Sequence, residues 1–372
     1  MKRLRLKPVD TFFFKGHATA DAGVHTVADG MFPPRSNTVY GALRAAYIHQ
    51  HSTFEDFAAG KDDAVKEWMG TPESFGSFRQ ALLLLMKNDE LLLPLPLDCQ
   101  VLKEEKLEVH PLTLTPDDLP SSNNASLWRL RASSNKKSAS AAGKFVPMRD
   151  WKKLLLSGES TEFLLAAADL IQRSPKVGIH LNKERRAEKH YFYQQQMLTM
   201  VGGCQLAVYA DPCPDFADVP FARLGAESRP WTIAEEDHSW TLWEEEELAQ
   251  LRQQLAATKL ARIVLLSPAV WGNGSRPGSF NEETKEIELS NGLRAEVLTA
   301  AVGRPDMYGG WDIVKHRPKE RRQMVPAGTV LYVRIAEADI DRFIALANGF
   351  TLTDEGAHEG FGFAVAAGVP NL

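Results

Sequence analysis

The sequence predicts an α+β protein with antiparallel sheets, and three observations lead to this fold class. Helical and strand-like apolar patterns interleave along all 372 residues. Hairpin patterns are frequent, as at Asn291-Gly292, which favours antiparallel sheets over one parallel, doubly wound sheet. The composition, with 44 % hydrophobic and 24 % charged residues, is ordinary for a globular chain. Because a single core stops growing near this length, we expect two α+β halves, residues 1–185 and 186–372.

The first half begins with a strand and a well-marked helix. The run LRLKPVDTFFF is rich in alternating large apolar residues and predicts a strand that ends near Pro8. In MFPPRSNTVYGALRAAYIHQ, two prolines end a loop, Ser36 or Asn37 can cap a helix, and apolar residues follow at helical spacing. Residues 54–69 predict a second helix, and FRQALLLLMKNDELLLPLPLD predicts two strands around a turn.

The middle of the chain predicts an exposed insertion, a helix and several strands. Residues 121–143 are rich in Ser, Asn and Ala and contain few core-forming residues, which is typical of an insertion on the surface. Residues 161–173 have helical periodicity, and VGIHLN predicts a short strand. YFYQQQMLTM followed by CQLAVYA predicts a strand pair.

The last part repeats this mixture. Residues 243–259 predict a charged helix, ARIVLLSPAV a buried strand, and EIELSNGLRAEVLTAAV a hairpin. VPAGTVLYVRI predicts another strand, residues 337–347 a helix, and the chain ends in EGFGFAVAAGVP.

Charge is unevenly distributed. The net charge of −5 argues against a protein that coats nucleic acid with its whole surface. Residues 183–190 (KERRAEKH) and 315–322 (KHRPKERR) are nevertheless basic, whereas residues 235–247 contain seven Asp or Glu. Local basic tracts on an acidic background can hold one polyanion along a defined path, although a solvated face is the commoner explanation of either tract alone.

Targeting and cysteine patterns point to the cytoplasm. MKRLRLKPVD is basic but no apolar segment follows it, and no run of 18 apolar residues exists, so we expect neither secretion by that route nor a membrane span. Cys99, Cys204 and Cys213 lack C-x-x-C spacing, which supports neither a disulfide framework nor a four-ligand zinc site. We expect no cofactor and no metal.

Two segments are candidate ligand sites. Gly360–Gly362 does not complete G-x-G-x-x-G, because Val365 stands where glycine is needed; this excludes a dinucleotide fingerprint. What remains is G-F-G-x5-G, ending at Gly368, whose glycines permit close approach of a ligand and whose Phe361 or Phe363 could stack on a base. A final strand with bulges explains the pattern equally well.

The second candidate is the helix start, whose free amides attract phosphate and which has Arg35 at its entrance. Ser36, Tyr40 and Arg44 share one helix face. The alternative is a simple capped core helix whose arginine is solvated.

Catalytic signals are weak. A metal-independent ribonuclease needs a general base for the 2′-hydroxyl, and of ten histidines only His25, in the loop before the first helix, is a candidate. His49 and His51 cannot share a helix face, so a metal pair is not expected there. No P-loop, H-E-x-x-H or G-x-S-x-G motif occurs.

Six segments, in order over nearly the whole chain, resemble one family: the RAMP-superfamily subunit numbered third in the Cmr effector complex of type III-B CRISPR systems. The segments are PVDTFFFKG, FPPRSNTVYGALR, PKVGIHLNKERRAEKHYFY, LGAESRP, YGGWDIVKHRPKERRQMVPAGTVLYVRI and GFGFAVAAG. The glycine-rich loop combined with FPP-x-S-x-T-x-YGALR is the most specific feature. One departure is Arg35, which stands where the family usually has a small residue or proline.

The resemblance implies two ferredoxin-like, RRM-like halves with insertions, in a cytoplasmic subunit that does not cleave RNA. Such a subunit caps the complex, holds the repeat-derived 5′ tag of the guide RNA, and contacts the large polymerase-like subunit and a backbone subunit. The residues expected to contact RNA, from the resemblance and from the charge pattern together, are Arg35, Ser36, Asn37, Thr38, Arg44, His180, Asn182, Lys183, Arg185, Arg186, Lys189, Lys315, Arg317, Lys319, Arg321, Arg322, Gly360, Phe361, Gly362, Phe363 and Gly368.

Two alternatives stay open. The chain could be the guide-processing endoribonuclease of the same superfamily, with His25 as base and no metal. It could also be an adaptor that binds only protein and whose basic tracts are solvated surface.

Overall fold

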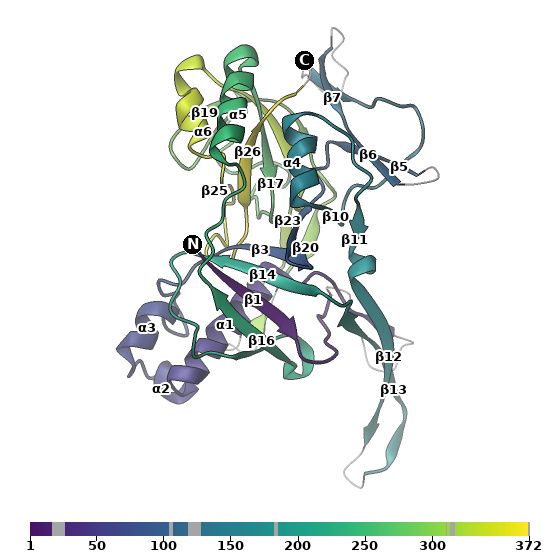
Figure 1. Cartoon of the computed structure of the whole chain (residues 1–372). Helices are drawn as coiled ribbons and strands as arrows, with labels where there is room; N and C mark the ends of the chain where they lie inside the picture. Colours follow the sequence, from purple (N-terminus) through teal and green to yellow (C-terminus); the bar gives the residue numbers. More distant parts are fainter. Residues whose placement is uncertain are drawn as a thin grey trace.

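The computed structural model describes residues 1–16, 27–103, 107–117, 128–181, 185–309, 311–312 and 317–370. Two large sheets share a core, helices pack around them, and a long hairpin projects from the body (Figure 1). Both large sheets are antiparallel throughout, so the predicted α+β class with antiparallel sheets is confirmed. No helix in the described part of the chain is both long and apolar enough to cross a membrane.

The larger sheet has eight strands, and its two faces pack against different cores. Along β3 and β14, Leu85 and Leu206 point into the core around the first helix, whereas Leu84 and Ala207 point into the core shared with the second sheet. This alternation follows from the two-residue period of a strand. In spatial order the strands are β11 (Leu165–Ala166), β10 (Lys144–Pro147), β4 (Glu90–Pro94), β3 (Gln80–Lys87), β14 (Cys204–Ala210), β1 (Lys2–Pro8), β16 (Pro230–Glu236) and β15 (Phe221–Arg223).

Three helices cover one face of this sheet: α1 (Ser36–His51), α2 (Phe54–Ala58) and α3 (Asp63–Met69). The single helix expected over residues 54–69 is therefore wrong. Gly60, at φ +66°, breaks it, and each piece has its own N-cap: Thr53 accepts from the backbone N–H of Asp56, and Asp62 accepts from that of Val65.

The second sheet has six strands and shares its core with the other face of the first sheet. Helices α4 (Met148–Leu156), α5 (Glu245–Thr258) and α6 (Ile340–Ile344) pack around it, and two short 3-10 turns, η2 (Ala226–Ser228) and η3 (Glu337–Asp339), lie in connections. In order, its strands are β18 (Glu286–Glu288), β19 (Arg294–Ala301), β24 (Val330–Arg334), β17 (Leu260–Leu265), β26 (Phe363–Gly368) and β25 (Phe350–Thr351).

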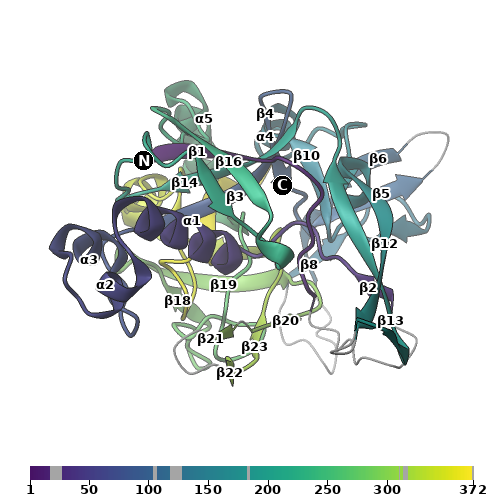
Figure 2. The same ribbon diagram turned by 90° about the horizontal axis from the view of Figure 1, so that it is seen from below.

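The projecting hairpin consists of β12 (Ile171–Leu181) and β13 (Ala187–Met200), with β2 (Val27–Asp29) parallel to β13 (Figure 2). The helix expected over residues 161–173 is wrong. Leu165 pairs with Phe145 in the sheet, Asp169 accepts from the backbone N–H of Ala166 to close the 3-10 turn η1 (Ala167–Leu170), and β12 begins at Ile171. Tertiary pairing here outweighs helical spacing.

The expected pairing of YFYQQQMLTM with CQLAVYA is also wrong, because β13 pairs with β12 and β2, whereas β14 inserts between β1 and β3. The expected boundary at 185/186 falls at the tip of the hairpin, and β14 to β16, which follow it in sequence, join the eight-stranded sheet. Residues from both sides of that boundary thus build one sheet.

Small sheets complete the structure. Residues 132–140 of the expected insertion are almost all exposed, in agreement with the prediction, and residues 118–127 lie outside the described part. The small sheets contain β5 (Cys99–Lys103), β6 (Leu107–Pro111) and β9 (Ser138–Ala139); β7 (Thr113–Pro116) and β8 (Trp128–Arg131); β20 (Asp306–Tyr308) and β23 (Arg322–Met324); and β21 (Trp311–Asp312) and β22 (Arg317–Pro318).

Candidate nucleic-acid interface

Gln80, the first residue of β3, joins the two segments that the sequence singles out. Its side chain is fully buried, and its Nε2 donates to the backbone oxygens of Ser36, at 3.0 Å, and of Glu359, at 3.1 Å. Its backbone N–H donates to the oxygen of His358. The start of α1 and the glycine-rich terminal loop, more than 300 residues apart in sequence, therefore lie side by side.

The glycines of this loop allow other parts of the same chain to approach its backbone closely. Gly360 has φ +84°, and a Cβ there would lie 2.9 Å from Nε2 of Gln80. Gly362 has φ +72°, and a Cβ there would lie 2.8 Å from the backbone oxygen of Leu352. Both positions thus require glycine for conformation and for close packing inside the chain.

The expected stacking of Phe361 or Phe363 on a base is contradicted, because both rings are buried. Phe361 is 1 % exposed and packs with Val270 and Met324, and Phe363 packs edge-on against Trp240. Gly368 is also misplaced in the prediction: it lies in β26, where its oxygen accepts from Nε of buried Arg262. The terminal pattern thus consists of a glycine-rich loop followed by a buried final strand.

At the start of α1, Arg35 occupies the N-cap position and no side chain caps the helix, so the expected capping by Ser36 or Asn37 is wrong. Ser36 is buried because its backbone meets Gln80, whereas Thr38 is exposed. The guanidinium of Arg35 pairs with Asp306 of β20 at 3.1 Å. This ion pair brings the β20–β23 hairpin to the same junction.

Arg44, expected on an RNA-facing surface, has a structural role. Its guanidinium donates to the backbone oxygens of Met69 at 2.7 Å, Thr71 at 2.6 Å and Ser74 at 3.2 Å. Burial lowers the pKa of Arg44 below its usual range. Because three carbonyls use these donors, Arg44 fixes the loop after α3 and has few donors left for a phosphate.

The basic tract 315–322 lies partly at this junction. Arg322 pairs with Glu355 of the terminal loop at 3.0 Å and with Glu320. Arg317, Lys319 and Arg321 are exposed and make no ion pair within the described residues. Lys315 lies outside the described part.

The other basic tract lies elsewhere. Arg185 and Arg186 are exposed at the tip of the β12–β13 hairpin, which both views place well away from α1 (Figures 1 and 2). His180 and Lys189 belong to the hairpin strands, but their side chains lie outside the described residues, as do Asn182, Lys183 and His25. The structure thus separates the two tracts.

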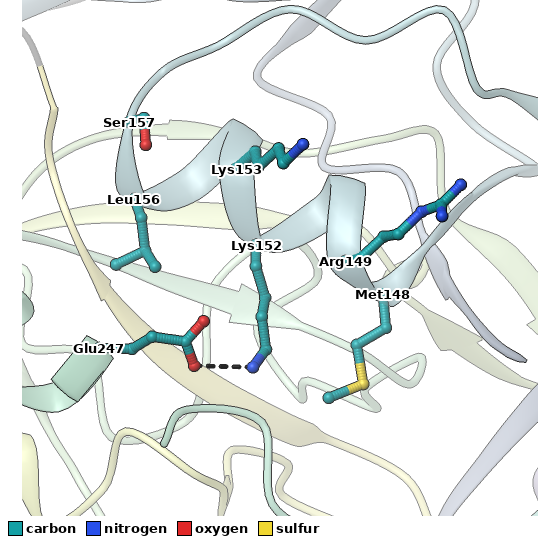
Figure 3. Close-up of a pocket in the computed structure, with 7 residues that line it drawn as sticks. All are labelled: Met148, Arg149, Lys152, Lys153, Leu156, Ser157 and Glu247. Carbon is teal, nitrogen blue, oxygen red and sulfur yellow. Dashed lines mark hydrogen bonds and ion pairs between the residues drawn. The ribbon is translucent and has the colours of Figure 1, made fainter. Parts of the chain in front are cut away.

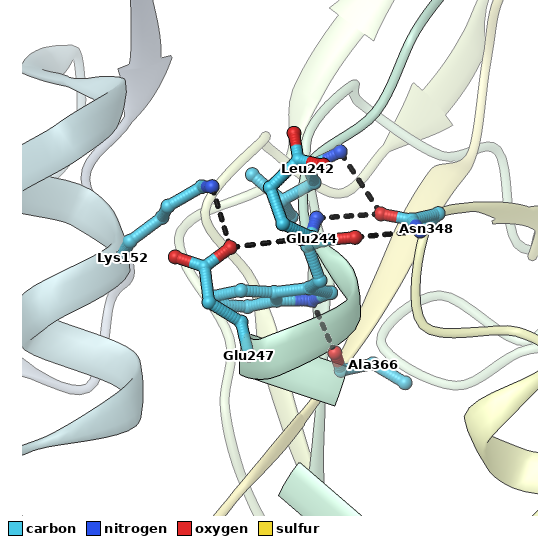
Figure 4. Close-up of polar contacts among 7 residues, drawn as sticks. Lys152, Leu242, Glu244, Glu247, Asn348 and Ala366 are labelled. Carbon is cyan, nitrogen blue, oxygen red and sulfur yellow. Dashed lines mark hydrogen bonds and ion pairs between the residues drawn. The ribbon is translucent and has the colours of Figure 1, made fainter. Parts of the chain in front are cut away.

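A cavity of about 500 Å³ borders α4, but its charged groups serve the fold (Figure 3). Lys152 pairs with Glu247 of α5 at 2.7 Å, and Arg149 pairs with Glu90 and Asp150. Glu247 also accepts from the backbone N–H of Glu244, which caps α5 (Figure 4). One carboxylate of the acidic run that starts α5, that of Glu247, therefore pairs with a lysine of its own chain, whereas Glu244, Glu245 and Glu246 are exposed.

Near the start of α5, the side-chain oxygen of Asn348 accepts from the backbone N–H groups of Leu242 and Trp243, at 2.9 and 2.6 Å (Figure 4). This contact fixes the segment that leads into α5. Among the described residues, no three His, Cys, Asp or Glu side chains gather as metal ligands would.

Sequence reasoning missed Gln80, Phe75, Arg79 and His358, which line the junction. No motif marks them: Gln80 begins an otherwise apolar strand, and Phe75 lies in a turn-rich segment, TPESFGSF. Only the tertiary contact between the two loops brings them together.

Comparisons with known proteins find one family model and several similar solved structures. The family model described as CRISPR-associated protein (Cas_Cmr3) matches residues 4–370. Among solved structures, a chain in "Cryo-EM structure of the Type III-B Cmr-beta bound to cognate target RNA and AMPPnP, state 1" aligns with TM-score 0.49 and 15 % identity, over 89 % of this chain and 86 % of that one. A chain in "Crystal structure of Csm3-Csm4 subcomplex in the type III-A CRISPR-Cas interference complex" aligns with TM-score 0.37 and 12 % identity, over 91 % and 96 %. No curated protein matches the chain.

Proposed function

Because the chain belongs to the Cas_Cmr3 family of CRISPR-associated proteins, we propose that it holds the 5′ repeat-derived tag of the guide RNA in a type III-B effector complex. In this role it bridges the large polymerase-like subunit and the backbone subunits in the cytoplasm, and it does not itself cleave RNA.

The observation that carries the proposal is the junction built around Gln80. It brings together the start of α1, the glycine-rich loop and the β20–β23 hairpin. Single-stranded RNA is recognised through phosphate contacts from Lys and Arg, backbone amides and stacking on aromatic rings. Lys319 and Arg321 supply exposed cations at this junction.

The β12–β13 hairpin offers a second contact along the same RNA. Its tip presents Arg185 and Arg186 to solvent, apart from the body. The chain has a net charge of −5 but two separate basic regions. This distribution favours binding of a polyanion along a defined path rather than over the whole surface.

Charge reversal tests the proposal. Arg185, Arg186 and Arg317 are replaced together by Glu, and incorporation of labelled guide RNA into the reconstituted complex is measured against salt. We expect at least a tenfold loss of RNA binding and a shallower salt dependence, because fewer counterions are released.

The matched control replaces three exposed cations that are not among the proposed RNA contacts, Lys66, Lys137 and Arg223, by Glu. It changes net charge equally, so it should retain binding within about twofold. Normal RNA incorporation by the first variant, or equal losses in both, would contradict the proposed RNA face.

A further inference from the structure

An exposed aromatic ring lies beside the terminal loop and is held rigidly. Phe75 is 47 % exposed, and its ring centroid lies 3.8 Å from that of His358. Tyr40 meets both rings edge-on, at 6.1 and 5.6 Å, and the guanidinium of Arg44 lies 5.7 Å from the centre of Phe75. One side of Phe75 is therefore supported while the ring remains open to solvent.

The loop that carries Phe75 is fixed by hydrogen bonds. Thr71 and Ser74 exchange backbone hydrogen bonds, and Arg44 donates to the oxygens of both residues. A Cβ at Gly70 would lie 2.3 Å from the backbone oxygen of Ser74, so the loop closes tightly on itself. A ring held this way loses little conformational freedom when it binds a ligand.

The surroundings of the ring are positively charged. Arg44, Arg79 and Lys319 make no ion pair within the described residues. Burial, together with the charges of Arg79, Lys319 and Arg44, lowers the pKa of His358 to about 4, so this ring is neutral near pH 7. Two carboxyls belong to the same segments: Glu359, next to His358, is partly buried and burial raises its pKa, and Glu73, two residues before Phe75, is exposed.

Unpartnered polar atoms gather at the same place. Five buried side-chain nitrogen or oxygen atoms that have no hydrogen-bond partner among the described residues surround this junction. Leaving such an atom unpaired is costly, so a cluster of them is unusual unless a ligand or ordered water completes it. The five are Nε of Arg35, Oδ1 of Asn37, Oη of Tyr40, Oε1 of Gln80 and Nε2 of His358.

An open ring face, cations without carboxylate partners and polar atoms without partners together fit a nucleotide. The base stacks on the ring, the phosphates contact Arg79 and Lys319, and polar groups meet the base or sugar. We propose that Phe75, supported by His358, is the stacking platform for one unpaired nucleobase of the bound RNA, with Arg79 and Lys319 contacting the adjoining phosphates. This inference rests on the proposed function and identifies where on the chain a base is held.

The test measures binding of the full chain to a labelled, single-stranded RNA copy of the repeat-derived tag, by fluorescence anisotropy at low salt. Phe75→Leu keeps an apolar side chain but removes the flat ring, and Phe75→Tyr keeps the ring. Phe54→Leu is the matched control, because Phe54 is 42 % exposed and contacts the ring of His49 near the far end of α1.

We expect Phe75→Leu to weaken binding about tenfold, equivalent to about 1.4 kcal/mol. Phe75→Tyr and Phe54→Leu should stay within twofold of the unmodified chain. The base is then located with RNAs that carry one abasic site each: at a single position the abasic site should weaken binding to the unmodified chain but not to Phe75→Leu.

Other outcomes separate this inference from the proposed function. If the unmodified chain binds the RNA and Phe75→Leu binds equally well, the stacking platform is wrong while the RNA-binding role stands. If Phe75→Leu binds RNA normally but no longer joins its neighbouring subunits, the ring is a protein contact and the inference is overturned. If the unmodified chain fails to bind RNA both alone and with its neighbouring subunits, the proposed function itself fails.

Discussion

Asp98 and Arg262 form an ion pair in the core shared by the two large sheets, with 3.4 Å between the carboxylate and the guanidinium and side chains only 1 % and 3 % exposed. Asp98 also accepts from the hydroxyl of Tyr332 at 2.7 Å, and Arg262 donates to the backbone oxygens of Leu155 and Gly368. These contacts join β17 and β24 of the second sheet to α4 and the segment before β5. A buried charge of this kind stabilises only while its partners remain.

Asp98→Ala should therefore destabilise the chain strongly. It leaves the buried guanidinium of Arg262 unpaired, and we expect a loss of about 3–5 kcal/mol in the free energy of unfolding, measured by urea denaturation. Glu296→Ala breaks a half-exposed ion pair with Arg334 and should cost no more than about 1 kcal/mol. Equal losses for the two variants would contradict the structural role of the buried pair.

Gly360→Ala tests the close approach of Gln80. The variant suffers both a positive φ and a Cβ 2.9 Å from Nε2 of Gln80, whereas Gly143→Ala has a similar φ of +72° and open space. Both should be destabilised by about 1 kcal/mol for backbone conformation, and Gly360→Ala by about 1–2 kcal/mol more. Thermal unfolding of the two proteins side by side measures the difference, and equal values would show that the approach is not tight.

Gln80→Met tests whether the junction depends on one side chain. Met has a similar length but cannot donate to the oxygens of Ser36 and Glu359, so we expect a loss of about 1–3 kcal/mol in stability together with weaker RNA binding. Gln205→Met, on β14 and away from the junction, is the control and should leave RNA binding unchanged. Full RNA affinity in Gln80→Met would separate the junction from RNA binding.

His358 predicts a pH dependence of stability. Its pKa is about 4 in the folded chain, below its ordinary 6.5, so between these values the unfolded chain binds more protons. Stability from this group is complete above pH 6.5 and is lost as the pH falls toward 4. His358→Gln removes this titrating group. The free energy of unfolding of the variant, measured by denaturant titration, should therefore fall less between pH 7 and pH 4.5 than that of the unmodified chain. Parallel curves would contradict the lowered pKa.

Local patterns predict much of the fold but not the partners of each element. The helix at Ser36, the strand ending at Pro8 and the hairpin at Asn291-Gly292 depend on nearby residues, and the structure confirms them. Residues 161–173 form no α-helix because the strands in this range pair with distant residues, which no local period reveals. The insertion of β14 between β1 and β3 is likewise a long-range choice.

The candidate site shows the same limit. The sequence identifies the helix start and the glycine loop as separate segments, and Gln80 joins them through contacts that no motif marks. The glycine-rich pattern predicts that Phe361 or Phe363 stacks on a base, but both rings are buried in the core. Phe75, in an unremarkable turn, has the open ring instead.

The central claim is that RNA lies at the junction of α1, the terminal loop and the β20–β23 hairpin. The most direct test is photo-crosslinking in the assembled complex, with a guide RNA that carries 4-thiouridine in its 5′ tag, followed by mass spectrometry of the crosslinked peptides. The account predicts crosslinks within residues 35–40, 72–80, 317–324 and 355–361. Tag crosslinks confined to other parts of the chain, or only to other subunits, would contradict it.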